Sequence, residues 1–190
     1  MTAAVSEATG TEYVLVGGAA ANVHTGGYRP TDFDLVGPLG PAVDRALGVL
    51  GFARRGRFLV LAAAGRELVL DLPDDTLFDL AGDPPDRVVV AEGVTAAVLS
   101  ATDLTMDRVL QATDGTAITL EEAVRLAVGA YRRIDWRALE SRSRAASEQG
   151  SGAYALLPAT LHRVRSLARR ALRDLNAARG EAADGLSPRA

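Results

Sequence analysis

The sequence predicts an α+β protein in which an α/β half of about 100 residues precedes a helical half. In the first half, short apolar runs of strand length alternate with clusters of Gly, Pro and Asp. From Thr102 onward the apolar residues recur at intervals of three and four, which is the period of a helix. We therefore expect an α/β core at residues 1–100, a helical region at 101–180 and a disordered tail at 181–190.

The first half contains six predicted strands and two predicted helices. The strands are expected at residues 13–16, 32–36, 57–63, 67–72, 87–91 and 95–99. The helices are expected at residues 17–25 and 41–50; Pro41 opens the second and Gly51 follows it. Residues 1–11 are small and polar without a period, and we expect them to be disordered.

The second half contains four predicted helices. They are expected at residues 102–112, 119–131, 135–147 and 156–178. Ser100 or Thr102 is expected to cap the first, Thr119 the second and Asp135 the third, because short polar side chains accept hydrogen bonds from the free backbone N–H groups at a helix start.

The composition excludes several classes of protein. Cysteine is absent, so the chain has no disulfide, zinc–thiolate site or cysteine nucleophile. The first residues, MTAAVSEATGTE, lack the basic start and apolar run of a signal peptide. No apolar run reaches about 18 residues, the length needed to cross a bilayer. We therefore expect a cytoplasmic protein without a membrane partner.

The most informative stretch is YVLVGGAAANVHTGGYRPTDFDLV, residues 13–36. Asp32 and Asp34 are one residue apart on a predicted strand, so their carboxylates point to the same side. Such a pair repels itself unless a cation lies between. Gly17 and Gly18 lie at the start of a predicted helix, where backbone N–H groups favour phosphate. Together these features indicate a metal site beside a phosphate site.

Asp71 supplies a third carboxylate. It lies at the C-terminal end of the predicted strand ELVLDL, and its side chain is expected on the same side as those of Val69 and Glu67. If this strand pairs beside the strand of Asp32 and Asp34, three carboxylates converge. Oxygen ligands of this kind, with nothing softer nearby, suit Mg²⁺ or Mn²⁺.

These motifs resemble a known family. The pattern LVGGAAANVH, then GYRPTDFDLVG, then the strand Asp in LVLDLP is similar to the minimal nucleotidyltransferases of the DNA polymerase β superfamily. The resemblance extends over residues 13–145 and includes the AbiEii-type toxins of toxin–antitoxin pairs. It implies a nucleotidyltransferase-type mixed sheet with flanking helices, followed by the helical half.

The resemblance also implies roles for particular residues. Gly17 and Gly18 would bind the nucleotide phosphates, and Asp32, Asp34 and Asp71 would hold the metal and act in catalysis. Many relatives carry a lysine in the first C-terminal helix. This chain has no lysine, so Arg108 would have to meet the phosphates there. Glu121 or Glu122 stands where some relatives carry an acid.

Arg29 and Thr31 precede the carboxylate pair in sequence, and they are candidates for contact with a phosphate or a ligand base. Six arginines between Arg163 and Arg179 stand against the single acid Asp174, in a chain whose net charge is −3. This run is either a nucleic-acid contact or an ordinary solvated helix face.

Three functions are compatible with these residues. The first is Mg²⁺-dependent transfer of a nucleoside monophosphate from an NTP to an acceptor hydroxyl; the toxin resemblance implies a tRNA 3′ end as acceptor and a neutralising antitoxin as partner. The second is the same transfer to a small molecule, such as an antibiotic, or to a protein side chain. The third is an inactive relative that binds a nucleotide or a protein without chemistry.

Overall fold

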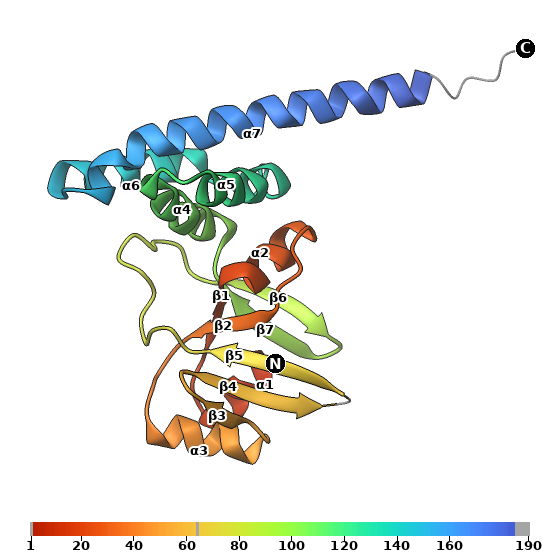
Figure 1. The fold of residues 1–190 in the computed structure, drawn as a ribbon, viewed down its shortest axis with the longest axis vertical. Helices are drawn as coiled ribbons and strands as arrows, with labels where there is room; N and C mark the ends of the chain where they lie inside the picture. The colour runs from red at the N-terminus through yellow and green to blue at the C-terminus, as the bar shows by residue number, and fades with distance from the viewer. Residues whose placement is uncertain (1, 64, 185–190) are drawn as a thin grey trace, which may run out of the picture. The chain divides into compact units, whose positions relative to one another are not determined.

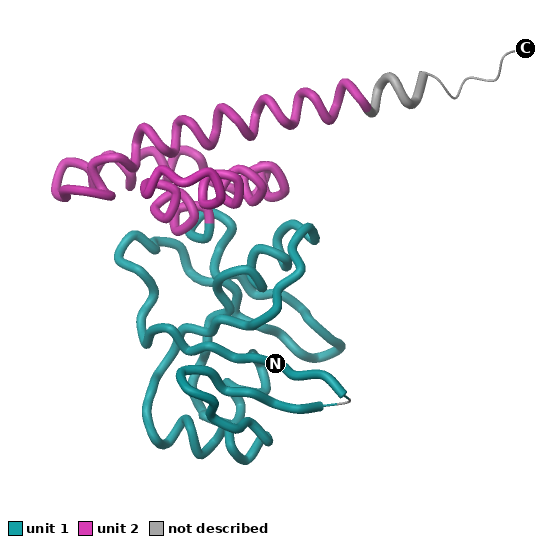
Figure 2. Tube along the Cα trace, viewed as in Figure 1, with its two compact units in different colours: residues 1–104 teal, residues 105–190 magenta. Residues whose placement is uncertain are grey.

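A computed structural model describes residues 2–63 and 65–184, with side chains through residue 178. The chain divides into two compact units, residues 1–104 and residues 105–190 (Figure 2). We call them the sheet unit and the helical unit. The strands of the sheet unit are β1 (Val14–Val16), β2 (Asp32–Val36), β3 (Ala53–Arg55), β4 (Phe58–Ala63), β5 (Arg66–Asp71), β6 (Asp86–Ala91) and β7 (Val94–Val98).

The sheet unit also contains three complete helices, and a fourth begins in it. These are α1 (Thr2–Thr9), α2 (Gly17–Thr25), α3 (Pro41–Val49) and α4 (Ala101–Gln111), the last of which ends in the helical unit. The helical unit continues with a 3₁₀ turn (Ala112–Asp114), α5 (Ala117–Gly129), α6 (Trp136–Gln149) and α7 (Ala153–Asp184) (Figure 1).

The seven strands form one mixed sheet in the order β3-β4-β5-β2-β1-β7-β6. The pairs β2–β5 and β1–β7 are parallel, and the other neighbours are antiparallel. The predicted α+β class with a mixed sheet is therefore confirmed. The order also brings β2 beside β5, the pairing on which the convergence of the three carboxylates depends.

One face of this sheet is an apolar core. The register places Leu15, Leu35, Leu59, Leu70 and Val98 on this face, and each is at most 6% exposed. Because side chains alternate along a strand, the aspartates of β2 and β5 lie on the opposite face. Burial of the leucine face therefore fixes the direction in which the carboxylates point, since a slip of one residue would turn them into the apolar core.

The N-terminal segment differs from the prediction. Residues 2–9 form α1 rather than a disordered stretch, and Val5 in this helix is completely buried. The helix contacts α3 and β7. The Ser6 hydroxyl accepts a hydrogen bond from the backbone N–H of Tyr13 at 3.0 Å. Tertiary packing therefore stabilises a helix that has no clear apolar period in its sequence.

Other elements also differ from the prediction. Strand β3 was not expected, because its three residues are all exposed and carry no apolar alternation. The N-cap of α5 is Thr116 rather than Thr119, since the Thr116 side chain accepts from the backbone N–H of Thr119. Helix α7 runs to Asp184, past the expected end of the helical region at 180, and residues 185–190 of the expected tail lie outside the described part of the chain.

The helical unit has a core of its own, in which α7 packs against α5 and α6. Its most buried side chains on α7 are Leu157, Leu161, Val164 and Ala168. Pro158 lies within the first two turns of α7. No helix in the described residues is long and apolar enough to cross a membrane.

Candidate active site

The candidate site is built on a row of residues across three neighbouring strands. Asp34 of β2 is in register with Val16 of β1 on one side and with Asp71 of β5 on the other. Residues in register on adjacent strands point to the same face, so the Asp34 and Asp71 carboxylates are neighbours. Asp32 shares this face of β2, one residue pair further along. The expected pairing of the two aspartate strands is confirmed.

Gly17 connects this row to the start of α2. It follows Val16 directly and has a φ of +63°, a conformation that side chains other than glycine rarely adopt. A Cβ atom at Gly17 would overlap the Oδ2 atom of Asp34. The Asp34 carboxylate therefore lies against the first residue of α2, where the helix dipole and free N–H groups favour negative charge.

Gly18 is the second residue of α2 and differs from Gly17. Its φ is not positive, and a Cβ atom at this position would meet nothing within 4 Å. The N-cap residue of α2, Val16, supplies no side-chain hydrogen bond to the helix start. The N–H groups of the first turn are thus not capped by the N-cap side chain, and negative charge is favoured beside them.

His24 holds the other end of α2. It is buried, and its Nε2 atom is 2.7 Å from the carbonyl oxygen of Leu99, to which the N–H tautomer donates. Leu99 in turn donates its backbone N–H to the carbonyl of Leu15 at 2.9 Å. This histidine therefore has a structural role, fixing α2 against the strand end beside β1.

The segment between α2 and β2 carries Arg29 and Thr31, and both residues are exposed. The Asn22 side chain of α2 accepts a hydrogen bond from the backbone N–H of Tyr28 at 3.2 Å, which ties the segment back to the helix. Because the segment leads directly into Asp32, both side chains are near the carboxylate pair in the chain and open to solvent.

Asp71 has a cationic partner that the sequence did not indicate. Its Oδ2 atom is 2.8 Å from an Nη2 atom of Arg57, and its side chain is 7% exposed against 74% for that of Arg57. Arg57 lies in the turn between β3 and β4, and its guanidinium carbon is 4.7 Å from the centre of the Phe58 ring. No local pattern around Arg57 could reveal this ion pair, since it depends on the pairing of β4 with β5.

A cavity of about 350 Å³ adjoins Asp71. Its charged lining comprises two ion pairs, Arg57 with Asp71 and Arg54 with Asp44. Its apolar lining comprises Leu39, Leu59, Leu72 and Pro73. This volume lies at the small end of the range for small-molecule pockets, and the mixed lining is typical of them.

The donor chemistry of the row fits a hard divalent cation, because carboxylate oxygens are the ligands that Mg²⁺ and Mn²⁺ prefer. Two of the three carboxylates are adjacent in register. However, within residues 2–63 and 65–184 no three acidic or histidine side chains form a ready group around one metal position. Asp71 is held by Arg57 instead.

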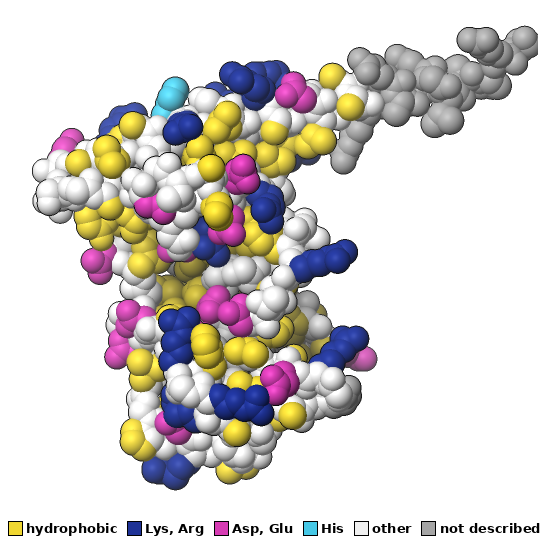
Figure 3. All heavy atoms as spheres, viewed as in Figure 1, with side chains coloured by type: hydrophobic (Ala, Val, Ile, Leu, Met, Phe, Trp, Pro, Cys, Tyr) yellow, Lys and Arg dark blue, Asp and Glu magenta, His cyan; other side chains and the backbone are white. Residues whose placement is uncertain are grey.

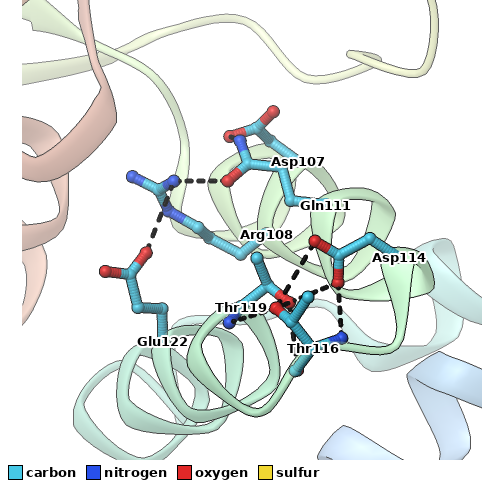
Figure 4. Close-up of polar contacts among 7 residues, drawn as sticks. All are labelled: Asp107, Arg108, Gln111, Asp114, Thr116, Thr119 and Glu122. Atoms are coloured by element: carbon cyan, nitrogen blue, oxygen red, sulfur yellow. Dashed lines mark hydrogen bonds and ion pairs between the residues drawn. The ribbon is translucent and has the colours of Figure 1, made fainter.

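Arg108 belongs to the helical unit. Its Nη1 atom donates to the Gln111 side chain at 2.6 Å and is 3.8 Å from the carboxylate of Glu122 on α5 (Figure 4). The neighbouring Asp107 accepts from Gln111 at 3.0 Å. Burial raises the pKa of Asp107, although the charge of Arg108 and the Gln111 hydrogen bond act in the opposite direction.

Asp114 has the opposite shift. Its carboxylate accepts from the backbone N–H of Thr116 at 2.8 Å and from the Thr119 hydroxyl at 2.7 Å (Figure 4). These hydrogen bonds, led by that of the Thr116 backbone, lower the pKa of Asp114. Asp114 therefore orders the start of α5 and has no part in the carboxylate row.

Acidic and arginine side chains are interspersed on the face of the sheet unit drawn in Figure 3. An uninterrupted basic surface, the usual footprint of a nucleic-acid-binding face, is not seen there.

No protein-family model matches the sequence, and no curated protein is similar to it. Among solved structures, the chain is similar to the solution structure of the antibiotic-resistance factor ANT(2'')-Ia, an aminoglycoside nucleotidyltransferase. The match has 16% sequence identity and a TM-score of 0.38, and it covers 94% of this chain and 92% of that chain.

Proposed function

We propose that the protein is a metal-dependent nucleotidyltransferase that transfers a nucleoside monophosphate from an NTP to an acceptor hydroxyl. The observation that carries this proposal is the placement of Asp34 beside Asp71 in parallel register, with the Asp34 carboxylate against the start of α2 at Gly17. A carboxylate pair next to a glycine helix start combines metal ligands with a phosphate cradle, as phosphoryl transfer requires.

In this proposal Asp32, Asp34 and Asp71 would hold Mg²⁺ or Mn²⁺. The bound ion would neutralise the triphosphate and lower the pKa of the attacking hydroxyl. The N–H groups of Gly17 and Gly18 would bind phosphate oxygens, with Arg29 and Thr31 as further contacts. The acceptor oxygen forms a bond to the α-phosphorus, the bond to pyrophosphate breaks, and the hydroxyl proton leaves to solvent. Arg108, by the family resemblance, would add positive charge for the phosphates.

The acceptor is proposed on two separate grounds. The toxin resemblance proposes a tRNA 3′ end, with the arginines of α7 as phosphate contacts and an antitoxin as partner. The cavity beside Asp71 favours a second candidate, a small-molecule acceptor, because a lined pocket of about 350 Å³ suits a small ligand better than an extended polymer.

The test is a transfer assay with Mg²⁺, each labelled NTP in turn, and either total RNA or a panel of small hydroxyl compounds. We expect label on an acceptor, and Asp32→Asn or Asp34→Asn should reduce the transfer at least about 100-fold without unfolding the protein. The control is Glu92→Gln, an exposed acid in the turn between β6 and β7.

The acceptor that takes the label decides between the candidates. Label on tRNA supports the toxin reaction, and label on a small compound or a protein supports the second. Full activity of Asp32→Asn would contradict the proposed site. Nucleotide binding without transfer would favour an inactive relative.

A further inference from the structure

The ion pair between Arg57 and Asp71 joins two side chains with very different surroundings. Asp71 ends a central strand and is almost completely buried, whereas Arg57 extends from a turn and is largely exposed. The turn contains Gly56, whose φ is +63°. Arg57 also rests on the ring of Phe58. The carboxylate is therefore fixed by the sheet, while its cation is on a long side chain that can move into solvent.

The positive charge of Arg57 compensates for the burial of the Asp71 carboxylate. A buried carboxylate is unfavourable unless it is paired, and the neighbouring carboxylate of Asp34 adds repulsion. The positive charge of Arg57 relieves both effects. A divalent cation bound by Asp34 and Asp71 would relieve them as well, and at Asp71 it would compete with Arg57 for the same carboxylate.

We infer that Arg57 is a tethered cation that holds Asp71 and is displaced from it when a divalent metal ion binds the aspartate pair. Displacement would leave the Arg57 guanidinium unpaired at the cavity it lines, next to the ion pair of Arg54 and Asp44. Arg57 thus lowers the metal affinity of the site. Its charge in the cavity is unpaired only when the metal is bound. The inference uses the proposed function only in taking the aspartate pair as the metal site.

The test measures Mn²⁺ binding without substrate, by the electron paramagnetic resonance signal of free Mn²⁺. Arg57→Gln removes the competing charge, and we expect the variant to bind Mn²⁺ about tenfold more tightly than the wild type, the factor that corresponds to losing one moderate interaction. If Arg57 only stabilised the fold locally, its removal would leave the affinity unchanged or weaken it, and either result would overturn the inference.

Arg55→Gln is the matched control. Arg55 precedes the same turn and pairs with Glu67 at 2.8 Å, but both of those side chains are largely exposed. The substitution changes the net charge by the same amount near the same place. We expect it to leave the Mn²⁺ affinity within about twofold of the wild type. An equal tightening in both variants would assign the effect to general charge and overturn the direct exchange.

A double-mutant cycle isolates the exchange at Asp71. Asp71→Asn should weaken Mn²⁺ binding, and adding Arg57→Gln should change it no further, because Arg57 then has no carboxylate to protect. A tenfold effect of Arg57→Gln that persists without Asp71 contradicts the inference, as does the absence of Mn²⁺ binding in Arg57→Gln itself. If Mn²⁺ displaces Arg57 as described but the protein transfers no nucleotide, the proposed function is wrong and this inference still holds.

Discussion

Gly17 is the residue at which backbone conformation and carboxylate chemistry meet. Its positive φ turns the chain from β1 into α2, and the missing side chain leaves the space that the Asp34 carboxylate fills. A larger residue would both strain the backbone and displace the carboxylate. The sequence predicts the turn at Gly17, and the phosphate role of Gly17 stays a prediction; the contact with Asp34 depends on the antiparallel pairing of β1 with β2.

Gly17→Ala should therefore be costly. We expect it to lower the free energy of unfolding by about 1–3 kcal/mol, since an alanine would adopt a left-handed conformation and overlap Asp34 Oδ2. Urea denaturation in the absence of metal measures this change. The stability control is Gly18→Ala, which meets open space at an ordinary φ and should be neutral or slightly stabilising within the helix. Equal losses in both variants would contradict this account of Gly17.

Most side-chain contacts that the sequence could not predict join residues that are far apart in the chain. Strand alternation, a local rule, predicts that Asp32 and Asp34 share one face, whereas the position of Asp71 beside them depends on the pairing of β2 with β5. Arg57 was missed because its partner is 14 positions away and is reached only through a hairpin. A turn arginine gives no signal of its own, so the ion pair that holds the candidate metal ligand is a property of the folded sheet.

At the scale of single elements, the predicted helices and strands agree with the structure where an apolar period or a cap residue was present. Ser100 caps α4 by accepting from the backbone N–H of Asp103 at 3.0 Å, and Asp135 caps α6. The start of α5 was misplaced because the segment offers three candidate caps, at Asp114, Thr116 and Thr119. All three share one hydrogen-bond network, so the sequence alone could not order them.

This network predicts a pH-dependent contribution of Asp114. Its pKa is lowered in the folded protein, so its carboxylate stabilises the fold above the pKa of the unfolded chain and loses this effect as the pH falls through the folded pKa. We expect Asp114→Asn to unfold at a lower temperature than the wild type at pH 7. The difference should shrink as the pH falls below about 4, the range in which unfolded aspartate is protonated. Thermal unfolding followed by circular dichroism measures it.

Asp107→Asn is the control of opposite sign. Burial raises the pKa of Asp107, so its ionised form opposes folding once the pH exceeds the unfolded pKa. The asparagine variant should therefore be at least as stable as the wild type at pH 7 and should lose its advantage in acid. The same pH trend in both variants would contradict the assigned hydrogen bonds.

At the scale of the whole molecule, the chain has two buried cores. The core of the sheet unit is built on residues such as Leu35 and Leu70, and the core of the helical unit on residues such as Leu139 and Leu161. The change of period at residue 102 anticipated a change of architecture, because strand and helix periods are visible within short windows. The boundary between the two units lies inside α4, after residue 104. Packing determines this position, and the apolar period of the sequence does not show it.

Separate cores predict separate responses to core substitutions. Leu161→Ala removes a buried side chain of α7 and should destabilise the helical unit by about 2–5 kcal/mol. Leu70→Ala should destabilise the sheet unit by a similar amount. Amide hydrogen exchange followed by mass spectrometry resolves the two: the first variant should exchange faster in α6 and α7, and the second in β2, β4 and β5.

Trp136 adds an independent measurement, because it is the only tryptophan of the chain and belongs to the helical unit. Its indole N–H donates to the carbonyl of Tyr131 at 3.2 Å, and the Arg165 guanidinium lies over its ring. Leu161→Ala should therefore lower the urea midpoint seen by tryptophan fluorescence more than Leu70→Ala does. If both variants shift that midpoint equally and accelerate exchange throughout the chain, the two units unfold as one cooperative structure, and the carboxylate row then depends on the helical core as much as on its own sheet.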